Sequence, residues 1–191
     1  MEKMETKSTA TIFFHGFTTI KGEKAPIDWD KERIKDYLIQ KAKLDKTADW
    51  GNSLYLSENI NVAMGYAKPD SCVGQDFGYI VVLKLSTPMP YIHSDSEAYA
   101  NTIQNGDDAK MEMANAMSEA KKLICQTDGN CAKNFMDFLG ENGYAYECFH
   151  DNEHRIEFIV PSNLINYFDV VGVFQVRNIN MDIVFSNYKN F

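Results

Sequence analysis

The sequence has no apolar run that approaches the roughly 20 residues a helix needs to cross a bilayer, although 45% of its 191 residues are hydrophobic and 13% are aromatic. Its first stretch, MEKMETKSTA, is charged and lacks the apolar segment of a secretory signal. A composition this apolar argues against a disordered chain. We therefore expect one water-soluble globular unit, made in the cytoplasm, with a core of substantial size.

Positive charge is also scarce. The chain carries 19 Lys and Arg residues against 27 Asp and Glu residues, a formal net charge of -8, and no basic cluster stands out. Proteins that bind nucleic acid by neutralising its phosphates usually present a basic face. Nucleic acid is therefore a disfavoured partner, and we expect no membrane association.

Cysteine patterns that bind metal are absent as well, because none of the four cysteines forms a CxxC pair. We interpret them as buried thiols; a disulfide between Cys125 and Cys131 stays open but is not needed. One string, HDNEH at 150–154, matches the H-x-x-E-H pattern of inverted zinc peptidases. That pattern works only on a helix, where both histidines share one face. Asp151 and Asn152 are turn residues between two strand-like runs, so we predict a solvated hairpin loop and no metal.

The first third of the chain alternates between strand and helix patterns. TIFFH at 11–15 is typical of a strand that ends at Gly16, and SLYL at 53–56 is typical of a second, shorter strand. Between them, residues 28–44 predict an amphipathic helix that begins at Asp28 or Asp30. Its apolar positions are Ile34, Tyr37, Leu38 and Leu44. After the second strand, Ser57 is a plausible N-cap of a helix that continues to Ala67.

The remaining chain is helical in the middle and strand-like at its end. Residues 78–86 predict a strand, 96–124 predict two helices, and 132–139 predict a helix with Gly140 as its C′ residue. Four strand-like runs follow, with no internal repeat, linker or low-complexity tract. This distribution favours an α+β fold with antiparallel or mixed sheets. We expect a single domain over 1–191 with a helical insert at about 94–143.

Three short segments carry the candidate chemistry. FFHGF supplies His15 and Gly16, LYLSENINVAMGYA supplies Tyr55 and Tyr66, and EHRIEFIVPS supplies Glu157 within an apolar strand. In this order, the aromatic-His-Gly strand end, the two tyrosines at their interval and the Glu followed by apolar residues and Pro resemble the ADP-ribosyltransferase superfamily. The resemblance is to its His-Tyr-Glu branch, which includes diphtheria-type toxins and poly(ADP-ribose) polymerases, and it covers about 25 residues.

The resemblance implies two antiparallel or mixed sheets split around an NAD cleft, with NAD as co-substrate and no metal. It implies that Glu157 stabilises the oxocarbenium-like transition state formed when the nicotinamide–ribose bond breaks. Tyr55 and Tyr66 would stack on the nicotinamide, Gly16 would present its backbone to the nicotinamide amide, and His15 would hydrogen-bond the adenosine ribose. Glu157, His15 and Tyr55 are thus the candidate catalytic residues, and His15, Gly16, Tyr55 and Tyr66 the candidate NAD-binding residues.

Two positions depart from the branch. Phe17 follows His-Gly where a Thr is usual, so the nucleotide-facing loop is expected to differ. Arg155 stands two residues before Glu157, where arginine-modifying members carry Glu or Gln, and this argues against arginine as the acceptor.

We therefore expect a mono-ADP-ribosyltransferase that modifies a macromolecule, a protein rather than nucleic acid, as a bacterial toxin or effector exported by a route that needs no Sec signal. Two alternatives stay open. The same site could hydrolyse NAD with water as acceptor, or the fold could be an inactive NAD-binding or interaction module. Transfer to DNA or RNA is a further possibility that the acidic composition disfavours.

Overall fold

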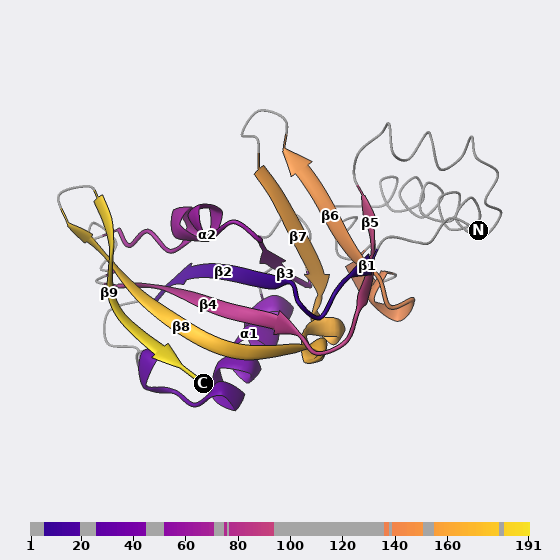
Figure 1. Ribbon diagram of the computed structural model, residues 1–191, viewed down its shortest axis with the longest axis horizontal. Coiled ribbons are helices and arrows are strands. Elements are labelled where there is room, and N and C mark those ends of the chain that lie inside the picture. Colours follow the sequence, from indigo (N-terminus) through magenta and orange to yellow (C-terminus); the bar gives the residue numbers. More distant parts are fainter. Residues whose placement is uncertain are drawn as a thin grey trace.

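The chain folds as an α+β protein with two β-sheets in a computed structural model (Figure 1). The structure describes residues 6–19, 26–44, 52–70, 75, 77–93, 136–137, 139–150, 155–179 and 182–191. The predicted fold class, α+β with antiparallel or mixed sheets, is confirmed, because one sheet is wholly antiparallel and the other contains one parallel pair.

The four-stranded sheet has the order β2-β4-β8-β9, and every neighbouring pair is antiparallel. Its strands are β2 (Ile12–Thr18), β4 (Gly78–Leu85), β8 (Phe168–Ile179) and β9 (Asp182–Asn190). The β-branched composition of β4 suits a central strand that is covered on both faces, and seven of its eight residues are buried.

The five-stranded sheet has the order β1-β5-β6-β7-β3. Its strands are β1 (Thr6–Lys7), β5 (Met89–His93), β6 (Ala145–His150), β7 (Arg155–Pro161) and β3 (Ser53–Leu56). Only β5 and β6 run parallel among these described pairs; the segment between them includes residues 94–135, which lie outside the described part of the chain. The proposed helical insert therefore stays a prediction.

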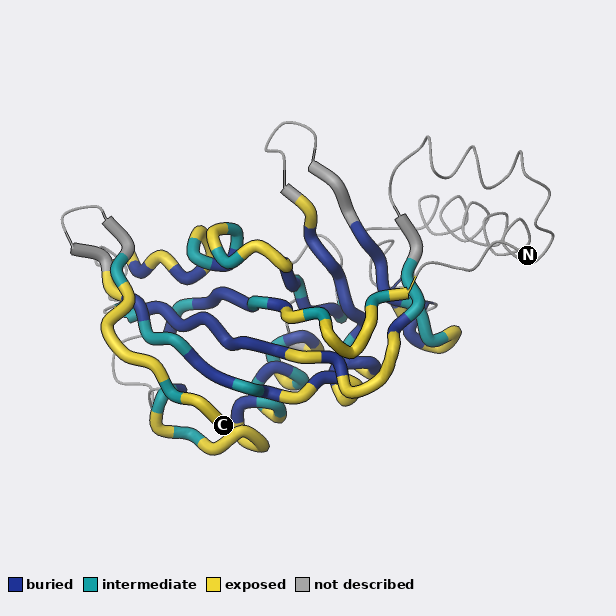
Figure 2. The backbone as a smooth tube through the Cα atoms, in the orientation of Figure 1, coloured by how far each residue is buried: buried dark blue, intermediate teal, exposed yellow. Residues whose placement is uncertain are grey.

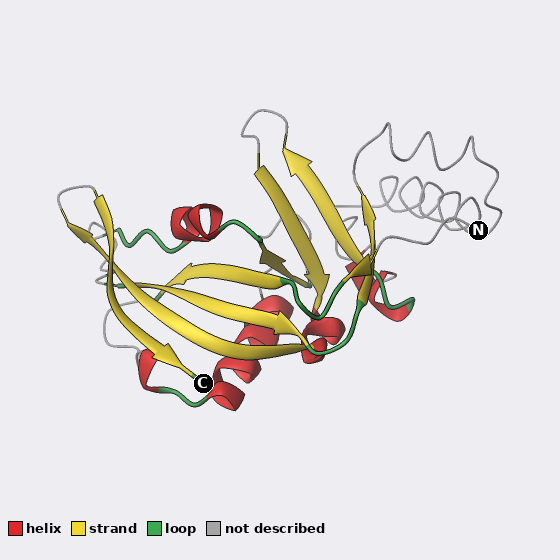
Figure 3. Cartoon of the chain, in the orientation of Figure 1, coloured by secondary structure: helices red, strands yellow, loops and turns green. Residues whose placement is uncertain are grey.

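The helices α1 (Lys31–Leu44) and α2 (Ile60–Tyr66) lie on opposite faces of the four-stranded sheet (Figures 1 and 3). Two short 3₁₀ helices, η1 (Pro26–Asp28) and η4 (Ser162–Tyr167), lie before α1 and after β7. The Asp30 carboxylate accepts a hydrogen bond of 2.8 Å from the backbone N–H of Arg33, which is the N-cap interaction expected at the start of α1.

The main core lies where the two sheets and α1 meet, and the strands through it are buried along most of their length (Figure 2). From α1 it takes Ile34, Leu38 and Ala42, which recur every four residues and so share one helix face. Tyr37 is only partly buried against this cluster. A smaller cluster packs α2 on the other face of the four-stranded sheet. Of the four predicted apolar positions of this helix, Ile34 and Leu38 are thus confirmed as core residues, and the side chain of Leu44 lies outside the described part of the chain.

Three predicted element ends are wrong. The strand around His15 does not end at Gly16 but continues to Thr18, because Gly16 and Phe17 pair with β4. Ser57 does not cap α2; the Asn59 side chain does, by accepting from the N–H of Asn61 at 3.0 Å.

The third concerns Gly140, which is helical rather than a C′ residue. Gly143 has the left-handed φ of 78°, and the Tyr144 N–H donates to the Leu139 carbonyl at 2.9 Å while the Gly143 N–H donates to the Gly140 carbonyl at 3.2 Å. This is the Schellman arrangement, in which the left-handed glycine lies just beyond the helix.

In the described part of the chain, no helix is long and apolar enough to cross a membrane.

Candidate functional site

The two sheets are joined edge to edge at Ser57. Its backbone forms an isolated antiparallel bridge with Phe14 of β2, with N–O distances of 2.8 and 3.0 Å. On its other side, the β3–β7 register pairs Leu56 with Phe158, so Ser57 lies beside Glu157. One residue therefore connects the strand of His15 with the strand of Glu157. Sequence analysis assigned Ser57 to a helix cap, and no local signal distinguishes a cap from an edge bridge.

His15 is held between the sheets by its Nδ1, which lies 2.7 Å from the Tyr55 carbonyl oxygen. A carbonyl only accepts, so Nδ1 carries the proton. Burial and, to a lesser extent, the Lys41 charge lower the pKa of His15 to about 3, against a smaller opposing effect of the Tyr55 carbonyl. The ring is therefore neutral near pH 7, and Nε2 has a lone pair. This buried nitrogen has no hydrogen-bond partner among the residues that the structure describes.

The depressed pKa makes the stability of the fold sensitive to acid through His15. The unfolded chain binds a proton at His15 near pH 6.5, whereas the folded chain does not until about pH 3, so stability is lost as the pH falls through this window. One pH unit within this window corresponds to about 1.4 kcal/mol. We therefore expect the free energy of unfolding to fall by about 2 kcal/mol through His15 when the pH is lowered from 6.5 to 5. Urea denaturation at both pH values should show a smaller loss for His15→Asn. Equal losses in the two proteins would contradict the assignment.

Gly16 lies under α2. A Cβ built on Gly16 would lie 1.8 Å from the Ala63 carbonyl oxygen and 2.7 Å from its carbon, so only glycine allows the helix this close. The missing Cβ therefore serves the approach of α2.

The backbone groups of Gly16 are directed away from β4. Phe14 bonds Ser57 on the outer edge of β2, and alternate residues of a strand point their backbone groups to the same edge, so the N–H and C=O of Gly16 point to that outer edge as well. The predicted contact of this backbone with the nicotinamide amide stays a prediction.

Tyr66 and Glu157 are in direct contact. Tyr66 is the last residue of α2 and is 45% exposed, whereas Glu157, in β7, is 3% exposed. The Tyr66 hydroxyl donates to Glu157 Oε1 at 2.5 Å, the short distance typical of a hydroxyl on a carboxylate. The hydrogen bond holds one end of the Tyr66 ring against the carboxylate while the exposed fraction leaves ring surface open to solvent.

The structure thus brings four of the five predicted residues together in two hydrogen-bonded pairs around one junction, and the fifth, Gly16, follows His15 in β2. His15 contacts Tyr55 across 40 positions of sequence, and Tyr66 contacts Glu157 across 91. Gly16 packs beneath the helix that carries Tyr66. The half-buried Tyr55 pairs with Ile159 in the β3–β7 ladder, two positions from Glu157. Phe17, the departure from the family pattern, belongs to β2 and stacks on His15 with ring centroids 5.7 Å apart.

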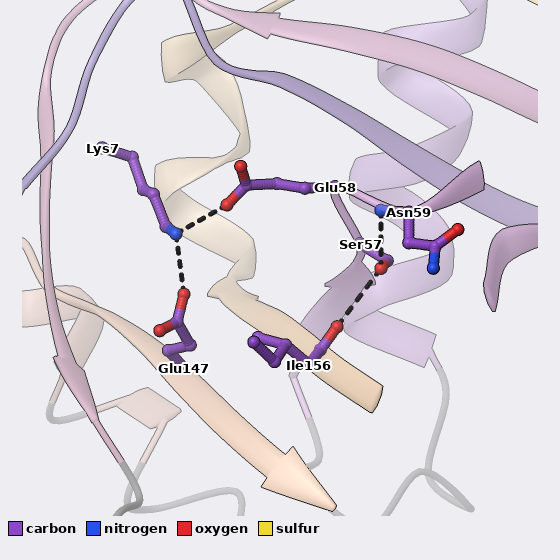
Figure 4. Close-up of polar contacts among 6 residues, drawn as sticks. All are labelled: Lys7, Ser57, Glu58, Asn59, Glu147 and Ile156. Carbon is purple, nitrogen blue, oxygen red and sulfur yellow. Dashed lines mark hydrogen bonds and ion pairs between the residues drawn. The ribbon is translucent and has the colours of Figure 1, made fainter. Parts of the chain in front are cut away.

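An ion-pair network beside the junction ties β1 to the corner between β3 and α2 (Figure 4). Lys7 Nζ lies 2.6 Å from Glu58 Oε1 and 2.8 Å from Glu147 Oε2. Burial lowers the pKa of Lys7, but hydrogen bonds and attraction from the two glutamates outweigh it, so that the pKa is raised on balance. Next to them, the Ser57 hydroxyl donates to the Ile156 carbonyl at 3.2 Å and accepts from the Asn59 N–H at 3.1 Å. These contacts hold the start of α2 against β6 and β7.

Of the HDNEH string, the structure describes only His150. His150 is the last residue of β6 and pairs with Arg155 of β7, so the string begins in a strand and not on a helix; residues 151–154 lie outside the described part. Within the described ranges, no three His, Cys, Asp or Glu side chains gather as metal ligands would.

No protein-family model matches the chain, and no curated protein matches it. The arrangement of the five residues and of the strands that carry them is therefore the basis for a function.

Proposed function

We propose that the chain is an NAD-dependent mono-ADP-ribosyltransferase of the His-Tyr-Glu type, which breaks the nicotinamide–ribose bond and transfers ADP-ribose to a protein. The observation that carries the proposal is the Tyr66–Glu157 hydrogen bond beside the His15–Tyr55 hydrogen bond. Three segments that are remote in sequence meet at one junction, and this meeting supports the proposal. The two-sheet α+β architecture supports the proposal at a coarser level.

Glu157 has the chemistry for bond cleavage. As nicotinamide leaves, positive charge spreads over the ribose ring, and a fixed carboxylate stabilises that charge more in the transition state than in the ground state. Burial in β7, with Tyr66 bonded to one oxygen, preorganises the carboxylate for this role. The cationic nicotinamide ring suits the faces of Tyr55 and Tyr66, each worth about 0.5–2 kcal/mol by stacking and cation–π attraction.

His15 suits a sugar hydroxyl better than it suits an anion. Its Nδ1 proton is committed to Tyr55, and the neutral Nε2 can only accept. A ribose hydroxyl of the adenosine half can donate to it, whereas an unprotonated phosphate oxygen cannot. A water molecule could also donate to Nε2. It would satisfy this buried acceptor without giving it a function.

The proposal is tested by measuring nicotinamide release and the incorporation of labelled ADP-ribose with the purified chain, in the presence and absence of a eukaryotic cell lysate. We expect release that rises with lysate and label in discrete protein bands. Nicotinamide release that does not change with lysate, without label on any protein, would indicate an NAD glycohydrolase instead of a transferase. No release, together with an NAD-dependent rise in melting temperature, would show an NAD-binding module, and no response to NAD would refute the proposal.

A further inference from the structure

Lys41 brings a positive charge to the His15 end of the candidate site. It projects from α1, and its Nζ lies 4.6 Å from the centroid of the Phe17 ring. The same Phe17 ring stacks on His15 with an interplanar angle of 27°. The ammonium thus lies one ring away from the imidazole, and its charge lowers the pKa of His15. Phe17 thus has two polar neighbours: His15, with its buried hydrogen-bond acceptor, and Lys41, with its positive charge.

Lys41 lies on a helix with other basic residues, in a chain that is acidic overall. The chain has a formal net charge of -8, and Glu157 places a carboxylate at the other end of the site. Among the described residues, Lys41 is the cation whose charge acts on His15.

We propose that Lys41 binds the diphosphate of the dinucleotide. The inference rests on the proposed function, since it takes NAD as the molecule whose ribose hydroxyl donates to His15 Nε2. The diphosphate is attached to that ribose through its 5′ carbon, so it lies a few bonds from the hydroxyl. A lysine places a compact charge on a flexible stem, and contact with the Phe17 face holds that charge beside His15 by cation–π attraction. Phe17 therefore has a part in NAD binding that a threonine could not supply.

Kinetics with two substrates distinguish binding of the diphosphate from a structural role. Nicotinamide riboside has the same scissile bond as NAD but no phosphate. For Lys41→Gln we expect the KM for NAD to rise about tenfold, as for loss of one charge-assisted contact, with kcat within twofold and kcat/KM for nicotinamide riboside unchanged. Lys41→Arg should restore most of the affinity. Lys43→Gln, an exposed position on the same helix, should leave all of these constants unchanged.

Equal losses of kcat/KM on NAD and nicotinamide riboside would overturn the proposal, as would an unchanged KM for NAD. Calorimetric titration with ADP-ribose separates this failure from failure of the proposed function. If the wild type releases no nicotinamide but Lys41→Gln weakens ADP-ribose binding about tenfold, the diphosphate site stands and the transferase does not. If ADP-ribose binds both proteins equally, or binds neither, the diphosphate site is refuted.

Discussion

Replacement of Glu157 by glutamine is expected to slow nicotinamide release about 10²–10³-fold, the usual effect of removing one preorganised electrostatic group. Glutamine keeps the shape of the side chain and can still accept from the Tyr66 hydroxyl, which donates to Oε1 in the structure. The substitution therefore removes the charge that the oxocarbenium-like transition state needs and leaves the walls of the site in place. Steady-state release assays with calorimetric NAD titration measure both effects, and we expect the Kd for NAD to change less than threefold.

Glu141→Gln is the matched control, because this glutamate is exposed beside Gly140 and Asn142 and outside the junction. Its kcat and melting temperature should equal those of the wild type. A Glu157→Gln protein that retains the wild-type rate would exclude Glu157 as the catalytic carboxylate. A loss of activity that accompanies a fall in melting temperature and a loss of NAD binding would show a structural residue instead.

Replacement of Gly16 by alanine is expected to lower the free energy of unfolding by about 3 kcal/mol, at the upper end of the cost of overpacking. The new Cβ would meet the Ala63 carbonyl, which is α2 backbone at 1.8 Å, so relief requires movement of the whole helix and not of one flexible side chain. That movement would shift Tyr66 relative to Glu157. We expect urea denaturation to show the loss of stability and release assays to show slower release in the protein that remains folded.

Gly65→Ala tests whether the effect is specific to the contact with β2. Gly65 lies on α2 itself, and a Cβ there would meet nothing within 4 Å. Because alanine is a better helix residue than glycine, stability should be unchanged or raised by up to about 1 kcal/mol. If Gly16→Ala proved as stable as Gly65→Ala, the close packing of α2 on β2 would be refuted.

The local elements followed from residue pattern where the physical signal was itself local. The four-residue spacing of Ile34 and Leu38 predicted the buried face of α1, and Asp30 marked its start. The run of β-branched residues at 78–86 predicted β4, a central strand with both faces covered. Side-chain periodicity and capping depend on neighbours within four residues, so a sequence shows them without knowledge of the tertiary fold.

Element ends depended on more distant partners and were predicted less well. Gly16 is a strand residue because β4 supplies a pairing partner, although glycine usually marks the end of a strand. Ser57 has the composition of a helix cap, yet its backbone pairs with Phe14. Gly140 could remain helical because Gly143 takes the left-handed conformation three residues later. In each case a contact or a neighbouring glycine outweighed the local preference.

The sequence by itself determined which side chains are available for chemistry: a histidine, a glycine, two tyrosines and a glutamate in an order that resembles one enzyme family. Only the tertiary structure decided how they meet. The bridge at Ser57 and the β3–β7 register bring Glu157 beside the strand of His15, and the close approach of α2 over Gly16 carries Tyr66 to the carboxylate. These contacts join residues 40 and 91 positions apart, and such distances are set by sheet register and helix packing, which no local pattern of residues specifies.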